Sequence, residues 1–245
     1  MKKYKLILND SIEVLGCKLF RICALVNFGI VKAGDLGGYI QSEKNLSHDG
    51  NAWVADNARV YDGAQVSGDA EVCGKAEIYV KAKVTDKAKV YGNACVAGNA
   101  KVSGNATVKD NTAVWGEAEI SGNAIVAEKA RVGGTTKVSG NAEVYGNVHA
   151  WEDAEIYGNA KVSGNAEVCG NAEVSEQSDL TVFKNNWSSG RHFTYTKSNK
   201  MWKVGCFYGT GQELIEEAYG DSEISGDHYK AYVDFVETLE RLGGE

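Results

Sequence analysis

Hydrophobic and polar positions repeat with a period of six residues over half of this chain. Twenty-one consecutive six-residue units run from Asp49 to Val174 without insertion or deletion, and the unit SGNATV at Ser103–Val108 is typical. The fourth position is Ala in 18 of the 21 units, and the sixth is Val or Ile in 20 of them. A short fixed period over so many units is typical of a solenoid, in which equivalent units stack on one another.

Within a unit, the run Ala-x-Val-x alternates as a β-strand does, so the Ala and Val side chains point to one side. These two columns are therefore predicted to form the interior. Gly and Asn, which usually occupy the second and third positions, tolerate positive φ angles and so predict a corner. Three corners close a triangle, so a coil takes 18 residues and the 21 units make seven coils. At about 4.8 Å between stacked strands, the stack is on the order of 30 Å long.

The segments outside the repeat have other patterns. Short strands are predicted at residues 4–8 and 18–22, and the first coil is predicted to begin near Leu36 because Ile40 and Leu46 already stand in the interior register. We therefore expect three parts, which are an N-terminal β cap (residues 1–35), a β-helix (residues 36–175) and a small C-terminal α+β module (residues 176–245).

The C-terminal module is predicted to contain strands at residues 180–183, 192–195 and 202–207. Thr210 and Glu213 have the spacing of a capping box, which predicts a helix through about Tyr219. Ser225 or Asp227 is expected to cap a last helix. The apolar side of that helix has three- and four-residue spacing and consists of Tyr229, Tyr232, Val233, Val236 and Leu239.

Composition narrows the classes of protein that fit. The chain has no proline, and its six cysteines contain no C-x-x-C pair, which favours reduced thiols in a cytoplasmic protein. The basic start at residues 1–5 is followed by an apolar run too short for a signal peptide, and no segment is long enough to span a membrane. Net charge is −7, with 2 basic and 10 acidic residues in 209–245. No basic stripe with interleaved aromatic residues is present, so direct nucleic-acid binding is not predicted.

Every third unit falls on the same side of the triangle, which sorts the outward residues into three faces. The polar face is charged or hydroxylated throughout, as at Lys101, Ser103, Glu119, Ser121 and Lys137. The mixed face combines Trp53, Tyr91, Ile125 and Tyr145 with Glu71, Lys89 and Lys161. The aromatic face carries Arg59, Tyr61, Glu77, Tyr79, Cys95, Ala97, Ala113, Trp115, Arg131, Gly133, His149, Trp151, Glu167 and Cys169.

Aromatic side chains beside small residues and few charges are typical of a surface that another molecule covers. We therefore predict an interaction face formed by Tyr61, Tyr79, Trp115, His149 and Trp151. Aromatic residues also simply suit strands, which is the competing interpretation.

The columns resemble those of hexapeptide-repeat proteins, in which an aliphatic residue at one corner is followed four places later by a small one. Val108 with Thr112 and Val138 with Ala142 stand in these places. The resemblance implies a mainly β fold, a left-handed parallel β-helix with three strands per coil. It also implies a homotrimer with parallel coils side by side, so a homo-oligomer is expected and a trimer is favoured.

If the chain is an enzyme, the resemblance to hexapeptide-repeat proteins implies one of two activities. These are acyl transfer, which uses a catalytic histidine, and carbonic anhydrase activity, which uses three zinc-binding histidines. Of the four histidines here, only His149 lies inside the regular coils, so no metal site and no cofactor are predicted. His149 is the weak candidate for a catalytic base, and the uninterrupted repeat leaves no acceptor-site loop. A pair of His192 and Cys206 is the other arrangement considered, for nucleophilic catalysis.

A further resemblance covers nearly the whole chain. The entry segment Val31–Ile40, the run Asn45-Leu46-Ser47 and the unit Gly50–Val54 look like those of phage- or prophage-encoded β-helix proteins described as hypothetical or transferase-like. The motif Gly205–Thr210, which leads into a helix with Glu213 and Leu214, resembles a module at the ends of similar phage proteins.

These observations favour a non-catalytic, self-associating solenoid that binds an unidentified host protein. The phage resemblance implies that this partner is a host enzyme or defence complex, which the chain would inhibit in the host cytoplasm. A hexapeptide-repeat acyltransferase is the first alternative, and a structural component of a phage particle is the second.

Overall fold

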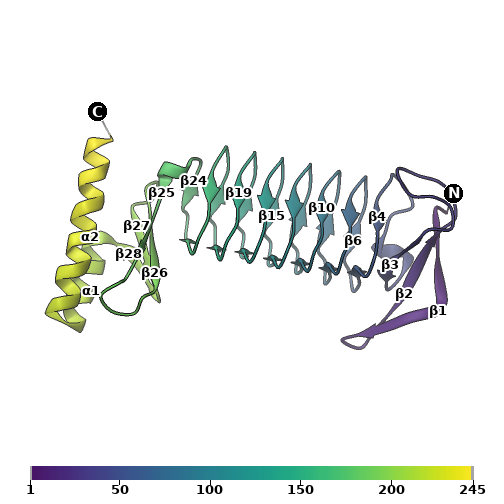
Figure 1. Ribbon diagram of the computed structural model, residues 1–245, viewed down its shortest axis with the longest axis horizontal. Helices are drawn as coiled ribbons and strands as arrows, with labels where there is room; N and C mark the ends of the chain where they lie inside the picture. The colour runs from purple at the N-terminus through teal and green to yellow at the C-terminus, as the bar shows by residue number, and fades with distance from the viewer. Residues whose placement is uncertain (1, 244–245) are drawn as a thin grey trace.

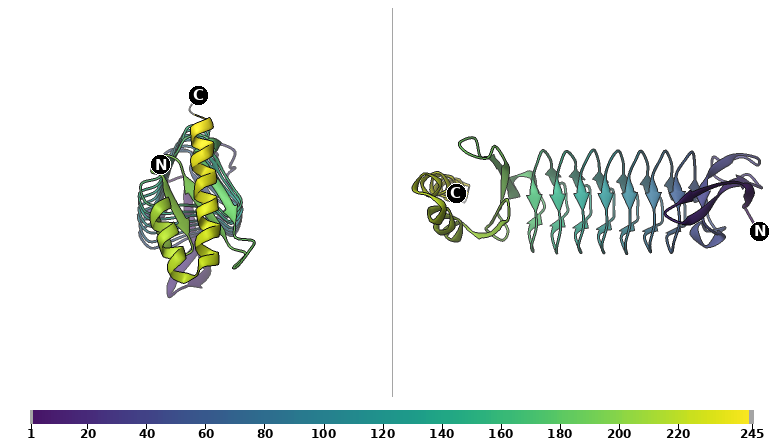
Figure 2. Two further views of the ribbon diagram at one scale, coloured as in Figure 1. Left: turned by 90° about the vertical axis from the view of Figure 1, so that its left-hand side faces the viewer. Right: turned by 90° about the horizontal axis from the view of Figure 1, so that it is seen from below.

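The computed structural model describes residues 2–243. They form a rod, a mainly β solenoid of about eight turns with three parallel sheets, followed by a small antiparallel sheet and two helices (Figure 1). The N-terminal strands lie at one end of the rod and the helices at the other, as Figure 1 and the right view of Figure 2 show. The predicted fold class is confirmed.

Each coil contributes one two-residue strand to each of three sheets, and equivalent strands pair 18 residues apart. The sheet of the polar face consists of β6 (Gln65–Val66), β9 (Lys83–Val84), β12 (Lys101–Val102), β15 (Glu119–Ile120), β18 (Lys137–Val138), β21 (Glu155–Ile156) and β24 (Glu173–Val174). The sheet of the mixed face consists of β4 (Trp53–Val54), β7 (Glu71–Val72), β10 (Lys89–Val90), β13 (Thr107–Val108), β16 (Ile125–Val126), β19 (Glu143–Val144) and β22 (Lys161–Val162).

The sheet of the aromatic face is longer because the N-terminal strands extend it to ten. Its order is β1 (Tyr4–Val14), β2 (Cys17–Ala24), β3 (Leu36–Ile40), β5 (Arg59–Val60), β8 (Glu77–Ile78), β11 (Cys95–Val96), β14 (Ala113–Val114), β17 (Arg131–Val132), β20 (His149–Ala150) and β23 (Glu167–Val168). The hairpin of β1 and β2 is antiparallel, and β3 is the first strand that pairs in parallel with a repeat strand.

The interior consists of the two predicted columns. Ala106 and Val108 have no exposed surface, and the same holds for nearly all equivalent residues, including Ile40 and Leu46 before the repeat. One unit carries the two residues in exchanged order, Val148 and Ala150, and both are also fully buried. The alternation of side chains in the sequence therefore predicts the core correctly.

The corners are made by the second position of the unit alone. All 21 residues there have φ between 55° and 84°, including seven that are not glycine. Asp is frequent among these, and Asp86 shows why, because its carboxylate accepts a hydrogen bond from the Gly104 N–H of the next coil at 2.9 Å. The third-position Asn residues do not take positive φ. Their side chains bond from coil to coil instead, as in the ladder Asn105, Asn123, Asn141 and Asn159.

Polar side chains close both ends of the stack. In every coil the backbone N–H groups donate to carbonyls of the following coil, so the first coil has free carbonyls and the last has free N–H groups. At the first coil, the ammonium of the buried Lys3 donates to Gly50 O and Ala52 O. At the last coil, the N–H of Glu167 donates to Thr194 Oγ1 and that of Glu173 to Ser198 Oγ.

A small antiparallel sheet lies on the C-terminal end of the coils. Its strands are β25 (Leu180–Lys184), β26 (His192–Thr196), β27 (Met201–Val204) and β28 (Phe207–Thr210). The single strand expected at residues 202–207 is wrong, because the chain reverses at Gly205, which has φ of 58°, and forms the pair β27 and β28.

Two helices cover the outer side of this sheet, α1 (Gly211–Asp221) and α2 (Glu223–Leu242). The capping box of Thr210 and Glu213 is confirmed. The predicted cap of the last helix is wrong. Ser222 caps α2 by accepting from the N–H of Ser225, so only one residue separates the helices. Short 3-10 turns at Glu43–Asn45 and Gln177–Asp179 stand before and after the repeat.

Candidate interaction surface

The N-terminal part of the aromatic face is covered by the chain itself. Tyr61 is only 3% exposed because Leu19 of β2 and Tyr39 of β3 pack around it. Its ring stacks on that of Tyr79 with 5.3 Å between centroids and 5° between planes. Burial raises the pKa of Tyr61 to about 12. Tyr61 is therefore a contact between the hairpin and the coils, and it does not present a free surface.

In the middle of the same face, Trp115 lies across a glycine of the next coil. A Cβ atom at Gly133 would stand 2.3 Å from Cε2 of Trp115, so only glycine leaves room for this indole. The small residue expected to let a partner approach thus seats a side chain of its own chain. The outer side of the indole remains open, and Trp115 is 40% exposed.

His149 and Trp151 lie next to each other in the following coil, with ring centroids 5.7 Å apart. Nζ of Lys203, from β27 in the C-terminal module, stands 5.7 Å from the centre of the Trp151 ring. His149 is half-buried and makes no ion pair or side-chain hydrogen bond with residues 2–243. A general base needs a partner that orients it and a place for the substrate, and the described residues supply neither at His149.

Ion pairs between neighbouring coils are more frequent on the polar and mixed faces than on the aromatic face. On the polar face, lysines pair with glutamates of the next coil, for example Lys137 with Glu155 at 2.7 Å. The mixed face has the same kind of pair, for example Lys161 with Glu143 at 3.2 Å. Exposed pairs of this kind contribute little stability but leave a well-solvated surface.

On the aromatic face, one such pair joins Arg59 to Glu77 at 2.7 Å, close to the hairpin. Further along, Arg131 is exposed and makes no ion pair within the part of the chain that the structure describes. We call the area formed by Ala97, Trp115, Arg131, Gly133, His149 and Trp151 the central recess.

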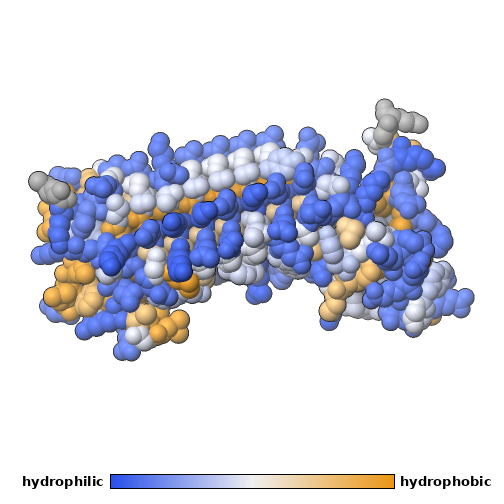
Figure 3. All heavy atoms as spheres, turned by 180° about the vertical axis from the view of Figure 1, so that it is seen from behind, coloured by the Kyte–Doolittle hydropathy of each residue, from blue (hydrophilic) through white to orange (hydrophobic). Residues whose placement is uncertain are grey.

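Both ends of the molecule border the aromatic face, because the hairpin packs on Tyr61 and Lys203 lies over Trp151. The hairpin of β1 and β2 projects below the rod at one end, and the C-terminal module projects below it at the other (Figures 1 and 2). The space-filling view shows the lower edge of the molecule set back between these two projections (Figure 3). A partner on this side would contact the coils between the two ends.

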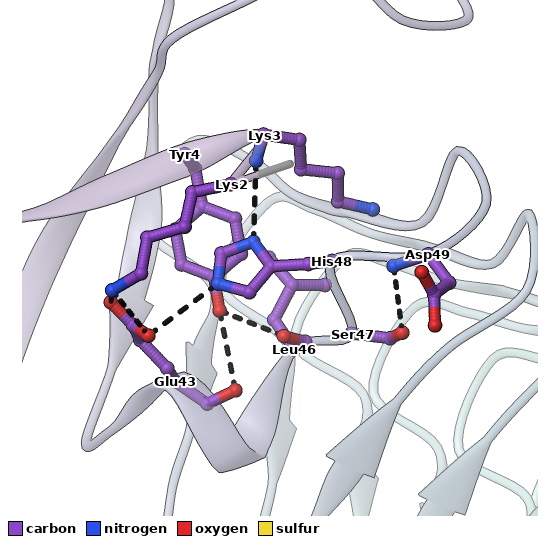
Figure 4. A network of polar contacts seen from close by, with 8 residues as sticks. All are labelled: Lys2, Lys3, Tyr4, Glu43, Leu46, Ser47, His48 and Asp49. Carbon is purple, nitrogen blue, oxygen red and sulfur yellow. Dashed lines mark hydrogen bonds and ion pairs between the residues drawn. The ribbon is translucent and has the colours of Figure 1, made fainter.

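A polar cluster that was not predicted from the sequence lies at the N-terminal end (Figure 4). The imidazole of His48 stacks on Tyr4 with centroids 4.3 Å apart, and its Nδ1 accepts from the Lys3 N–H at 3.3 Å. The proton of the ring is therefore on Nε2, which stands 3.5 Å from Oε2 of Glu43. Lys2 donates to the same carboxylate at 2.7 Å, and this hydrogen bond lowers the pKa of Glu43.

This cluster has the residue types of an acid–base site, but each group has a structural partner. The Tyr4 hydroxyl donates to Leu46 O at 2.7 Å, and burial raises the pKa of Tyr4 far above its ordinary value. These contacts together hold the start of the chain, residues 2–4, against residues 43–48, the segment that enters the coils. Only the close spacing of aromatic and charged residues at positions 2–4 and 43–48 hints at it in the sequence.

In the C-terminal module, His192 of β26 and Cys206 of the turn after β27 line the same cavity, whose volume is about 260 Å³. No hydrogen bond joins them, and Nε2 of His192 stands 3.5 Å from Asn165 instead. The considered Cys–His pair is therefore not formed in the described structure.

No group of three or more His, Cys, Asp or Glu side chains within residues 2–243 is arranged to hold a metal ion. The same residues contain no helix with the length and apolarity that crossing a membrane requires. Comparison with known proteins finds no protein family and no curated protein that matches the sequence.

Proposed function

We propose that this chain is a non-catalytic β-solenoid that binds a protein partner at the central recess. The observation that carries the proposal is the contrast between the faces. Two ion pairs join neighbouring coils on each of the polar and mixed faces, whereas the recess, within the described residues, holds no such pair and presents an open indole and an unpaired guanidinium. Tryptophan and arginine are the residues that most often provide the binding energy of protein interfaces.

The chemistry of the recess indicates what the partner presents. Trp115 offers an apolar surface, and Arg131 stands one coil away beside His149. A partner with an apolar side chain flanked by a carboxylate would cover the indole and pair with the guanidinium at once. The resemblance to phage-encoded proteins makes a host enzyme or defence complex the partner we propose, with inhibition as the outcome.

A homotrimer is the other way to cover the same surface. Side-by-side packing of parallel coils would bring the aromatic faces of neighbouring copies together, as the resemblance to hexapeptide-repeat proteins implies. The hairpin borders the aromatic face at Tyr61 and the C-terminal module borders it at Trp151, which favours a partner that inserts between them over a flat neighbour.

The test is the double variant Trp115→Glu with Trp151→Glu, because both side chains point out of the coil and the interior stays unchanged. Its matched control is Lys101→Glu with Lys137→Glu on the polar face. Thermal melting verifies that both variants fold, light scattering gives their mass, and capture from host lysate gives their partners. We expect the tryptophan variant to lose the captured proteins that the control retains.

Two other results have clear meanings. If the parent has the mass of three chains and the tryptophan variant that of one, the recess binds other copies of the chain. If the tryptophan variant keeps the parent mass and captures the same proteins, the proposal is wrong.

A further inference from the structure

Helix α2 has two apolar sides. One is buried in the C-terminal module, and the other is largely exposed, with contacts to the module only at its edge, where Phe235 meets Phe183 and His228 stacks on Trp187. The inner side contributes Val233 and Val236 to a cluster with Phe193, Trp202 and Leu214. The opposite side carries a second row with alternating spacing of four and three residues, formed by Ile224, His228, Ala231, Phe235, Thr238 and Leu242. We call this row the outer seam.

Most of the outer seam is open to solvent, and His228, which is half-buried beneath Trp187, is the exception. Ile224 is 66% exposed, Leu242 is 65% exposed and Phe235 is 51% exposed. Four- and three-residue spacing is the pattern of helices that pack along a seam against another helix. An apolar row of this kind on the surface of a protein indicates that something covers it.

The position of α2 leaves room for a large partner. The helix forms the far end of the rod and runs across its long axis (Figure 1). Viewed from that end, α2 is the foremost element, and no other segment lies in front of it (Figure 2). The outer seam therefore faces away from the coils.

We propose that the outer seam is a homodimer interface, on which α2 of a second copy packs in antiparallel orientation. In this arrangement residue n of one helix lies opposite residue 466 − n of the other. Phe235 then meets Ala231 of the second copy, and Ile224 meets Leu242. Each large ring thus faces the smallest residue of the seam, which is the size match that close helix packing requires.

Charges beside the seam support the same pairing. In antiparallel helices, Asp227 of one copy lies near Arg241 of the other, and two-fold symmetry produces this pair twice. Arg241 makes no ion pair within residues 2–243, so its guanidinium is available. At the centre, Asp234 would meet Asp234 of the second copy, but Lys230 of the same helix pairs with this carboxylate at 2.6 Å and reduces the repulsion.

A parallel arrangement of the two helices would be less favourable in both side-chain packing and charge pairing. Phe235 would face Phe235 and Ala231 would face Ala231, which crowds one layer of the seam and leaves a void in the next. Arg241 would lie beyond the reach of Asp227 of the second copy, because the two residues are separated by 14 positions along helices that run the same way. The sequence of the seam therefore selects the antiparallel arrangement.

A basic helix from another protein is the competing occupant, because residues 209–245 carry 10 acidic and 2 basic residues. The second copy is favoured because the acidic and basic residues that flank the seam are complementary under two-fold symmetry. The resulting dimer joins two rods tail to tail, with the coils extending in opposite directions.

The experiment is a charge reversal followed by its rescue, measured on the full chain by sedimentation and by small-angle X-ray scattering over a wide range of concentration. We expect the parent to dimerise, with a maximum dimension close to twice that of the monomer. Arg241→Asp should raise the dissociation constant at least tenfold, since it turns both attractive pairs into repulsive ones. Adding Asp227→Arg to this variant should restore the parent value within about threefold.

Controls separate this interface from others. Arg191→Asp changes the net charge equally in the same module, outside the seam, and should leave the dissociation constant unchanged. Ile224→Glu with Leu242→Glu, two exposed positions, should give a monomer that melts like the parent at concentrations at which the parent is also monomeric. A parent that is monomeric throughout overturns the proposal, as does a dimer that is insensitive to Arg241→Asp or is not restored by the double reversal. A dimer that only Trp115→Glu with Trp151→Glu dissociates would also overturn it.

Discussion

The exchanged pair in the interior, Val148 and Ala150, provides a sharp test of how the coils are packed. The other regular units place Ala or Thr at the fourth position and Val or Ile at the sixth, and this unit places the larger residue first. Both side chains are fully buried. We expect either single substitution to destabilise the protein, and the double exchange that restores the common order to be tolerated.

The magnitude follows from the volumes involved. Val148→Ala removes two methyl groups from a fully buried site, which costs about 1.6 kcal/mol in transfer free energy and, with the cavity left behind, about 2–3 kcal/mol in all. Ala150→Val adds the same volume to a filled layer and costs about 1–3 kcal/mol. The double variant conserves volume and should lose less than about 1.5 kcal/mol.

Urea denaturation of the parent, the two single variants and the double variant forms a thermodynamic cycle. The single variants should lose about 3–6 kcal/mol in sum, so the cycle should show a coupling free energy of at least about 1.5 kcal/mol. For a chain of this length, each kcal/mol lowers the melting temperature by about 2–4 °C, which thermal melting can verify. Additive losses would refute the idea that the two residues fill one shared layer.

Two further predictions concern the corner and the N-terminal cap. Gly122→Val should lower the melting temperature by several degrees, because Gly122 has φ of 68° and a β-branched residue in this conformation costs about 1–2 kcal/mol. Gly122→Asp should melt close to the parent, as Asp86 occupies an equivalent corner; equal melting of the two variants would contradict this account. Burial lowers the pKa of Lys3 to about 8 from 10.5, so the folded state binds fewer protons than the unfolded state above pH 8. The unfolding free energy should therefore rise between about pH 8 and pH 10, by up to roughly 3 kcal/mol, and Lys3→Met should lack this rise when titrated in parallel.

The coils could be predicted from the sequence because every unit repeats the same alternation of interior and exterior residues. Each Ala-x-Val run fixes which side chains point inward, and a shift of one residue would bury the charged column in place of the valines. The interior register at Ile40 and Leu46 followed from the same rule and is confirmed. The corner was located correctly, although the sequence alone does not show that Asn105 bonds to the next coil instead of making the turn.

The ends could not be predicted in the same way, because their contacts join residues that are distant in the sequence. Nothing near Tyr61 indicates that the hairpin of β1 and β2 folds over it, and nothing near Lys3 shows that its ammonium binds carbonyls of residues 50 and 52. The turn at Gly205 was missed because an apolar run of six residues fits one strand as well as two short ones. The interaction face at Trp115, His149 and Trp151 stays a prediction.

The hydrogen bonds along the coils all run in one direction, and this gives the rod a polarity like that of a growing polymer. One end offers free carbonyls and the other offers free N–H groups, so two bare stacks would match head to tail with their own repeat spacing. Such a contact leaves each joined stack with the same two ends, so nothing limits its length, and the product would be a filament. Lys3 donates to a free carbonyl of the first coil, and Thr194 and Ser198 accept from free N–H groups of the last coil. These side chains therefore block the addition of another stack at either end. A few polar side chains at the ends thereby keep a sequence suited to endless stacking at a defined number of coils.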